Sequence, residues 1–183
     1  MDPDFIHLAA TWRDFYLLVG TAAATLLGLM FVAVTFGASF VSAEASETAR
    51  AFLDPTFMHF VQVLLTACAF VSPSMSPTLL GALLVVAGII RISSLRSVYR
   101  QMRAAHERHN DLEVDDWISG IVVPLVAHIA LIGTGAGFLT GRPAFAWLAG
   151  VTVVVLVTGI YSAWELLLWL ALTRARTGNR DHR

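Results

Sequence analysis

The sequence contains a single cysteine, Cys68, and no lysine, since all twelve basic residues are arginine. One cysteine cannot supply a disulfide framework, a CxxC motif or a cysteine-based metal site within the chain. Charged residues make up only 14% of the sequence, well below the ~25% of soluble domains. These shortages exclude a disulfide-stapled fold and argue against a soluble domain.

Catalytic motifs are missing as well. The sequence has no Walker loop, no GxSxG motif, no Rossmann fingerprint and no internal repeat. Its first residues, MDPDFIHLAATWRDFY, are acidic where a signal peptide is positive, and they hold no small-residue cleavage site. We therefore expect no enzyme activity, and we expect the first hydrophobic segment to be retained.

Long apolar runs dominate what is present. Hydrophobic residues make up 57% of the 183-residue chain, and the mean hydropathy is +0.71. A transmembrane helix takes about 20 residues, so the chain has room for about five spans and for no separate soluble domain. We predict an all-α integral membrane protein in which residues 1–183 form one transmembrane domain. The spans are expected at about residues 15–40, 56–72, 78–92, 118–140 and 144–172.

Prolines at the starts of predicted helices mark three of these boundaries, at Pro55, Pro77 and Pro143. After Ile92, apolar residues keep helical spacing while arginines take the other face. We therefore predict that the third helix extends into a cytoplasmic segment of about residues 93–117. The second and third spans are short, and whether both cross the membrane fully stays open.

The arginines predict the orientation. With five spans, Arg13 and Arg142 fall on one side and the other ten arginines on the opposite side. The positive-inside rule then puts the N-terminus outside and the C-terminus in the cytoplasm of a bacterial inner membrane. Arg96, Arg100 and Arg103 are placed to meet anionic lipid headgroups, worth around 1 kcal/mol each. Lipids are thus expected partners, and nucleic acid is not.

Aromatic residues fall near the predicted membrane edges, as interfacial belts require. Those on the outer side are Trp12, Phe15, Tyr16 and Trp147, and those on the inner side are Trp117 and Trp169. Their positions support the span edges independently of hydropathy.

In the first span, Gly20, Ala24 and Gly28 stand four residues apart, a face that lets another helix approach closely. Helix packing, including self-association into a homo-oligomer, is the simpler interpretation. The alternative is that this face lines a pore in an oligomer together with Thr21, Thr25 and Thr35. Residues 14–36 also resemble the opening helix of small uncharacterised bacterial polytopic membrane proteins with the pattern FYxLVGxAAAxLxGLxFVA. That resemblance covers one helix and implies no known activity.

Five strongly polar residues lie inside the predicted spans, and each is costly in hydrocarbon without a partner or water. They are His59, Gln62, Arg91, His128 and Glu165. From a rise of 1.5 Å per residue, all lie in the cytoplasmic half or near the midplane, with His59 and His128 separated by about 10 Å in depth. Any functional site is therefore expected toward the cytoplasmic side.

Two interpretations of these residues compete. In the first, they form a structural network in which Glu165 pairs with Arg91 or accepts from Gln62, and the histidines bond to neighbouring helices. In the second, they line a cytoplasm-facing cavity where Glu165 and a histidine, chiefly His128, bind a cation or relay a proton. The leading functional hypothesis is a homo-oligomeric ion channel or transporter-like protein, and the rival is a non-catalytic membrane-embedded accessory or interaction subunit.

A membrane metal or haem protein is a second alternative. The side chains of His59, His128 and Glu165 suit zinc or iron, but no HExxH or ExxH spacing joins them. A haem between the two histidines needs ligands at similar depth, which the depths calculated above oppose. We therefore expect no cofactor. The glycine run from Gly133 to Gly137 allows either an unwound backbone that coordinates an ion or close helix packing.

Overall fold

The computed structural model describes residues 3–38, 43–73, 75–109 and 122–178. These residues form five helices and no strand, which confirms the all-α prediction. The helices are α1 (Pro3–Ala38), α2 (Ala43–Val71), α3 (Pro77–His109), α5 (Val123–Leu139) and α6 (Phe145–Gly178). As predicted, α3 continues as one helix beyond its apolar part, to His109.

Three segments are long and apolar enough to cross a membrane, namely Phe5–Phe36, Pro77–Arg96 and Phe145–Leu168. The apolar parts of the other two helices are shorter, Thr56–Val71 in α2 and Val123–Leu139 in α5. The 17 residues assigned to α5 extend about 26 Å at 1.5 Å each, and residues 110–121 before them lie outside those described. The protein is thus an α-helical membrane protein in which three helices have long apolar spans.

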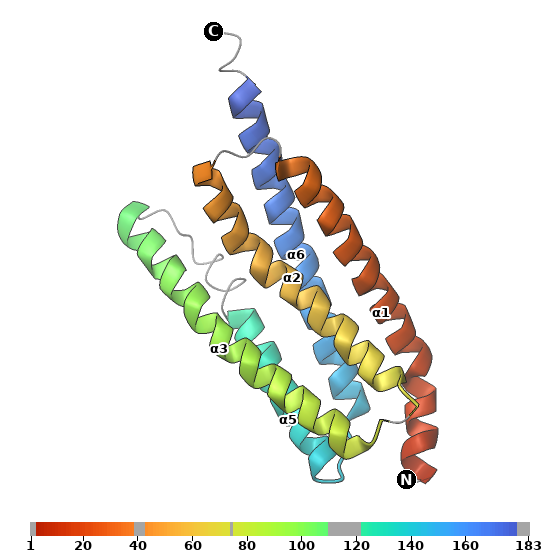
Figure 1. The fold of residues 1–183 in the computed structure, drawn as a ribbon. Helices are drawn as coiled ribbons and strands as arrows, with labels where there is room; N and C mark the ends of the chain where they lie inside the picture. Colours follow the sequence, from red (N-terminus) through yellow and green to blue (C-terminus); the bar gives the residue numbers. More distant parts are fainter. Residues whose placement is uncertain (1–2, 39–42, 74, 110–121, 179–183) are drawn as a thin grey trace.

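The helices pack as two groups (Figure 1). Helix α3 makes its most extensive contact with α5, while α1 packs on α2 and α2 packs on α6. The groups meet mainly where α5 lies on α6, and over a smaller area where α3 lies on α2. We call this boundary between the α3–α5 pair and the α1–α2–α6 group the seam.

Glycines explain why α3 and α5 pack so closely. A Cβ atom built on Gly81 would lie 2.7 Å from the backbone oxygen of Gly135, and one built on Gly135 would lie 2.8 Å from the oxygen of Gly81. Contact between small residues lets helix backbones approach without a hydrophobic driving force. Helix α5 is also continuous from Gly133 to Gly137. The packing interpretation of this run therefore holds, rather than an unwound ion ligand.

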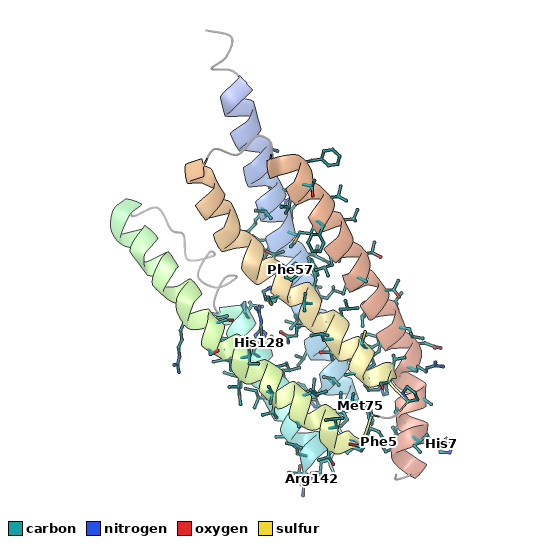
Figure 2. All side chains as sticks on the ribbon, in the orientation of Figure 1. Phe5, His7, Phe57, Met75, His128 and Arg142 are labelled. Carbon is teal, nitrogen blue, oxygen red and sulfur yellow. The ribbon has the colours of Figure 1, made fainter. Side chains whose placement is uncertain are left out.

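Aromatic rings fill the end of the bundle that contains the N-terminal part of α1 and the two turns between α2 and α3 and between α5 and α6 (Figure 1). Phe145 lies 5.5 Å from Phe5, 5.8 Å from Phe70 and 5.3 Å from Phe138, measured between ring centroids. Figure 2 shows Phe5 and Met75 at this end, with His128 farther along the bundle. Aromatic packing thus fills the end that the arginine pattern predicts to be outside.

Tyr16 corrects the predicted aromatic belt. It is 0% exposed and stacks on Phe70 with ring centroids 3.9 Å apart. Its side chain turns inward because α2 and α6 cover that face of α1, which hydropathy alone does not reveal. Trp147 is 72% exposed and fits the belt prediction. Trp117 lies outside the described residues, as does the side chain of Trp169.

A shallow apolar groove of about 430 Å³ runs between α1 and α2. Gly20 sits at its base, where a Cβ would come within 2.8 Å of the Cβ of Ala67. Ala24 and Cys68 line the groove and are exposed. Gly28 is exposed too, and a Cβ added there would meet no atom within 4 Å. Of the three small residues, Gly20 therefore packs within the protomer while the other two remain on its surface.

Candidate functional site

A buried polar cluster lies across the seam, and we define it by four residues. Helix α2 provides His59 and Gln62, α3 provides Arg91 and α5 provides His128. All four side chains are buried. The structure thus brings together four of the five intramembrane polar residues that the sequence singles out.

His128 is the centre of the cluster and is 0% exposed. Its Nδ1 bonds to the backbone oxygen of Pro124, one turn earlier in α5. Its Nε2 lies 3.0 Å from Oε1 of Gln62 on α2. One imidazole therefore joins its own helix to the helix across the seam, and Figure 2 shows His128 in the gap between the α3 and α2 ribbons.

Glycines place the two histidines. A Cβ on Gly88 of α3 would lie 3.2 Å from the backbone oxygen of His128, and a Cβ on Gly159 of α6 would lie 3.1 Å from the Cβ of His59. Each histidine therefore sits where a neighbouring helix approaches closely. Their ring centroids are 6.3 Å apart and their planes are inclined at 46°.

This proximity corrects the separation of about 10 Å in depth predicted from the sequence. The rings of His128 and His59 therefore lie at similar levels in the bundle. The predicted depths took every helix as upright in the membrane, whereas membrane helices are usually tilted. The fourth span was expected to begin near residue 118, which lies outside the described residues, so the start of that span stays a prediction.

Arg91 contributes a buried positive charge. It is 9% exposed, and its Nε has no hydrogen-bond partner among the described residues. It lies one helical turn beyond Gly88, and its charge acts electrostatically on His128. A charged group in hydrocarbon is costly, so a buried arginine is an unusual residue to find at the seam.

Glu165 stands apart from the cluster. It is half-buried on α6, six residues beyond Gly159, which is roughly 9 Å along the helix axis. Gln62 bonds to His128, where the structural interpretation had named Glu165 as its partner. Because helix periodicity predicts faces but not which faces meet, the sequence could not settle this pairing.

The geometry is a poor fit to a metal or haem. Among the described residues, no three His, Cys, Asp or Glu side chains come together in a group that could hold a metal ion. Both ring nitrogens of His128 already have protein partners, and a metal needs an unprotonated nitrogen as ligand. Binding would therefore sacrifice one of these hydrogen bonds beside the positive charge of Arg91.

The threonines of the first helix satisfy themselves. The hydroxyls of Thr21, Thr25 and Thr35 donate to backbone oxygens four residues earlier, at 2.7, 2.9 and 2.8 Å. Such bonds let an exposed hydroxyl face lipid without another partner. The alternative of a threonine-lined pore therefore gains no support from these side chains.

Arg96 is exposed on α3. The side chains of the other two predicted headgroup-binding residues, Arg100 and Arg103, lie outside those described. The role of all three at the lipid surface stays a prediction.

Sequence reasoning missed one element of the site, the backbone oxygen of Pro124. The signal was present, since Pro124 and His128 stand four residues apart and share a helix face. What the sequence does not reveal is that the imidazole turns back to that oxygen. Comparison with protein-family models, with curated proteins and with solved structures found no match for this chain.

Proposed function

We propose that the protein is a multi-pass inner-membrane protein that moves small ions, as a homo-oligomeric channel or transporter-like protein without enzyme activity. The buried polar cluster is its ion-handling centre, and Glu165 lies between this cluster and the cytoplasmic end. In this proposal the N-terminus is outside and the C-terminus is cytoplasmic, as the arginine pattern predicts. Reporter domains fused to each terminus test the orientation, and activity of a cytoplasmic reporter at the N-terminus would contradict it.

The observation that carries the proposal is the bond between His128 and Gln62 at the seam. Burying polar and charged groups in a membrane interior is costly, so such groups usually mark ion or proton paths. Here the polar groups join the α3–α5 pair to the α1–α2–α6 group. Relative motion of these two groups would change the geometry of the site. The aromatic side chains packed at the other end favour access to the cluster from the cytoplasmic side alone in this conformation.

Reconstituted vesicles test the function. The purified protein is placed in liposomes that contain a pH-sensitive or ion-sensitive dye, and gradients of protons, sodium, potassium and chloride are applied in turn. We expect flux of one ion that falls to the level of empty vesicles in His128→Asn, because asparagine cannot exchange a proton as imidazole does. Glu165→Gln is expected to change the rate or its pH response. His7→Asn, at an exposed histidine of α1, is the matched control and should behave as the wild type.

Complete burial of His128, with both ring nitrogens bonded, also favours a second candidate. This is a non-catalytic accessory subunit in which the cluster only holds the helices together. If this candidate is correct, His128→Asn has lowered thermal stability. Its flux is then at the wild-type level, or flux is absent from the wild type and the variant alike. That result would contradict the ion-handling proposal.

We infer that a second copy packs on the exposed face of α1 formed by Ala24 and Gly28. Gly28 leaves open space around it, and small residues in membranes permit the backbone contact that drives association. Gly28→Leu should lower the oligomeric fraction, measured by light scattering in detergent, while thermal stability stays within about 0.5 kcal/mol of wild type. An unchanged oligomer would rule out this face.

A further inference from the structure

The partners of His128 impose a simple rule on its protons. The backbone oxygen of Pro124 can only accept a hydrogen bond, so Nδ1 of His128 must carry a proton to bond with it. As oriented, Gln62 also presents an acceptor, Oε1, to Nε2. With one acceptor at each ring nitrogen, the site matches an imidazole that carries two protons.

Gln62 can serve the neutral ring equally well. A half-turn of its amide exchanges the oxygen for the NH₂ group, which can donate to an unprotonated Nε2. The Nδ1–H bond to Pro124 is unaffected by this exchange. The pair therefore offers a full set of hydrogen bonds to each of two protonation states without moving a helix.

We propose that His128 is a reversible proton-binding site, and that Gln62 forms a hydrogen bond with either protonation state by rotating its amide. This inference deepens the function proposed above, on which it rests, by naming the proton as the ion handled. When a proton arrives from water, an Nε2–H bond forms, the ring gains one positive charge and the amide turns its oxygen inward. When that proton leaves to water, the Nε2–H bond breaks and the amide turns its NH₂ group inward.

The surroundings favour a proton over a metal cation. A metal ion needs several ligands, and no group of three suitable side chains occurs in the described part of the chain. A proton needs only one lone pair, and Nε2 supplies it in the neutral ring. The positive charge of Arg91 acts on the site and repels a divalent ion more strongly than a single proton.

The charged and titratable neighbours of His128 come from several helices. Helix α2 provides His59, with its ring centroid 6.3 Å away, and α3 provides Arg91. The titratable residues of the described part of α6 are Tyr161, which is exposed, and Glu165, roughly 9 Å along the axis from the level of His59. Helix α1 has described titratable side chains only toward its N-terminal end: His7, Arg13, Asp14 and Tyr16. The near electrostatic environment of His128 is thus set by His59 and Arg91.

Nitrogen NMR tests the proposal directly. The full-length protein is labelled with ¹⁵N-histidine in lipid nanodiscs, and ring nitrogen shifts are followed from about pH 5 to about pH 8, the range in which histidine ordinarily titrates. Comparison with His128→Asn assigns the signal among the six histidines. We expect Nε2 of His128 to change from protonated to unprotonated while Nδ1 stays protonated.

Two variants at Gln62 separate its role from that of the site as a whole. In Gln62→Glu, a carboxylate acceptor should raise the ratio of protonated to neutral His128 at a fixed pH about tenfold, since charge-assisted bonds are stronger. In Gln62→Met, the cation loses its acceptor and the ratio should fall about tenfold.

A single protonation state of wild-type His128 throughout the range would overturn the proposal, and this result needs no folded variant. Titration that is identical in both Gln62 variants would overturn the role of Gln62. Because these measurements require no ion gradient, the expected titration in a protein without flux would support the proton site and contradict the transport function alone.

Discussion

Replacement of Gly135 by alanine is expected to destabilise the protein by about 3 kcal/mol, near the upper end of the usual cost of overpacking. The new Cβ would lie 2.8 Å from the backbone oxygen of Gly81, 2.9 Å from Cγ2 of Val85 and 3.1 Å from Cβ of Leu84. A backbone oxygen cannot rotate away as a flexible side chain can, so α3 and α5 must separate locally. Unfolding in mixed detergent micelles, followed by circular dichroism, measures the loss.

The same helix offers a matched control. A Cβ on Gly133 would meet no atom within 4 Å, so Gly133→Ala should change stability by no more than about 1 kcal/mol, the difference in helix propensity between the two residues. Equal losses in the two variants would show that the close packing of α3 on α5 does not hold in the membrane. Because Gly88 brings α3 near His128, the Gly135 variant should also disturb the NMR signal of that ring.

Much of the fold could be predicted from the sequence because the bilayer leaves few choices. Backbone groups in hydrocarbon must be bonded internally, so long apolar segments become helices. Pro77 marks the start of α3 as predicted, whereas α2 begins at Ala43 and continues through the predicted boundary at Pro55. The start of the predicted fourth span, near residue 118, lies outside the described residues and stays a prediction. Hydropathy measures the solvent that a segment prefers and cannot reveal where its helix starts.

The site was only partly predictable, for a related reason. The cost of placing polar groups in hydrocarbon identifies His59, Gln62, Arg91 and His128 as unusual residues. The helical period, however, does not reveal how one helix is rotated against another. Which faces meet depends on where backbones can touch, and that is set by glycines such as Gly88 and Gly159. The same pattern had allowed Glu165 in the cluster, whereas the packing of α6 at Gly159 leaves it farther along the helix.

Truncation of either partner in the His128–Gln62 pair should be costly, while truncation of both should be cheaper than the sum. His128→Leu leaves the amide of Gln62 buried without its partner, and Gln62→Leu does the same to Nε2 of His128. Each single variant is expected to lose about 2 kcal/mol, since an unsatisfied buried polar group costs about 1 to 3 kcal/mol. The double variant removes both groups, so it should lose less than the roughly 4 kcal/mol that additivity requires.

The four proteins of this cycle also distinguish a structural cluster from a functional one. If the cluster only joins helices, the double variant should recover the activity of the native protein together with its stability. An ion-handling centre predicts recovered stability with flux still at the level of empty vesicles, because leucine carries no proton. Strict additivity of the two losses would contradict the bond between His128 and Gln62. Stability and flux are expected to diverge because a membrane interior accepts leucine more readily than histidine. Stability alone therefore gives no reason for an imidazole at the seam.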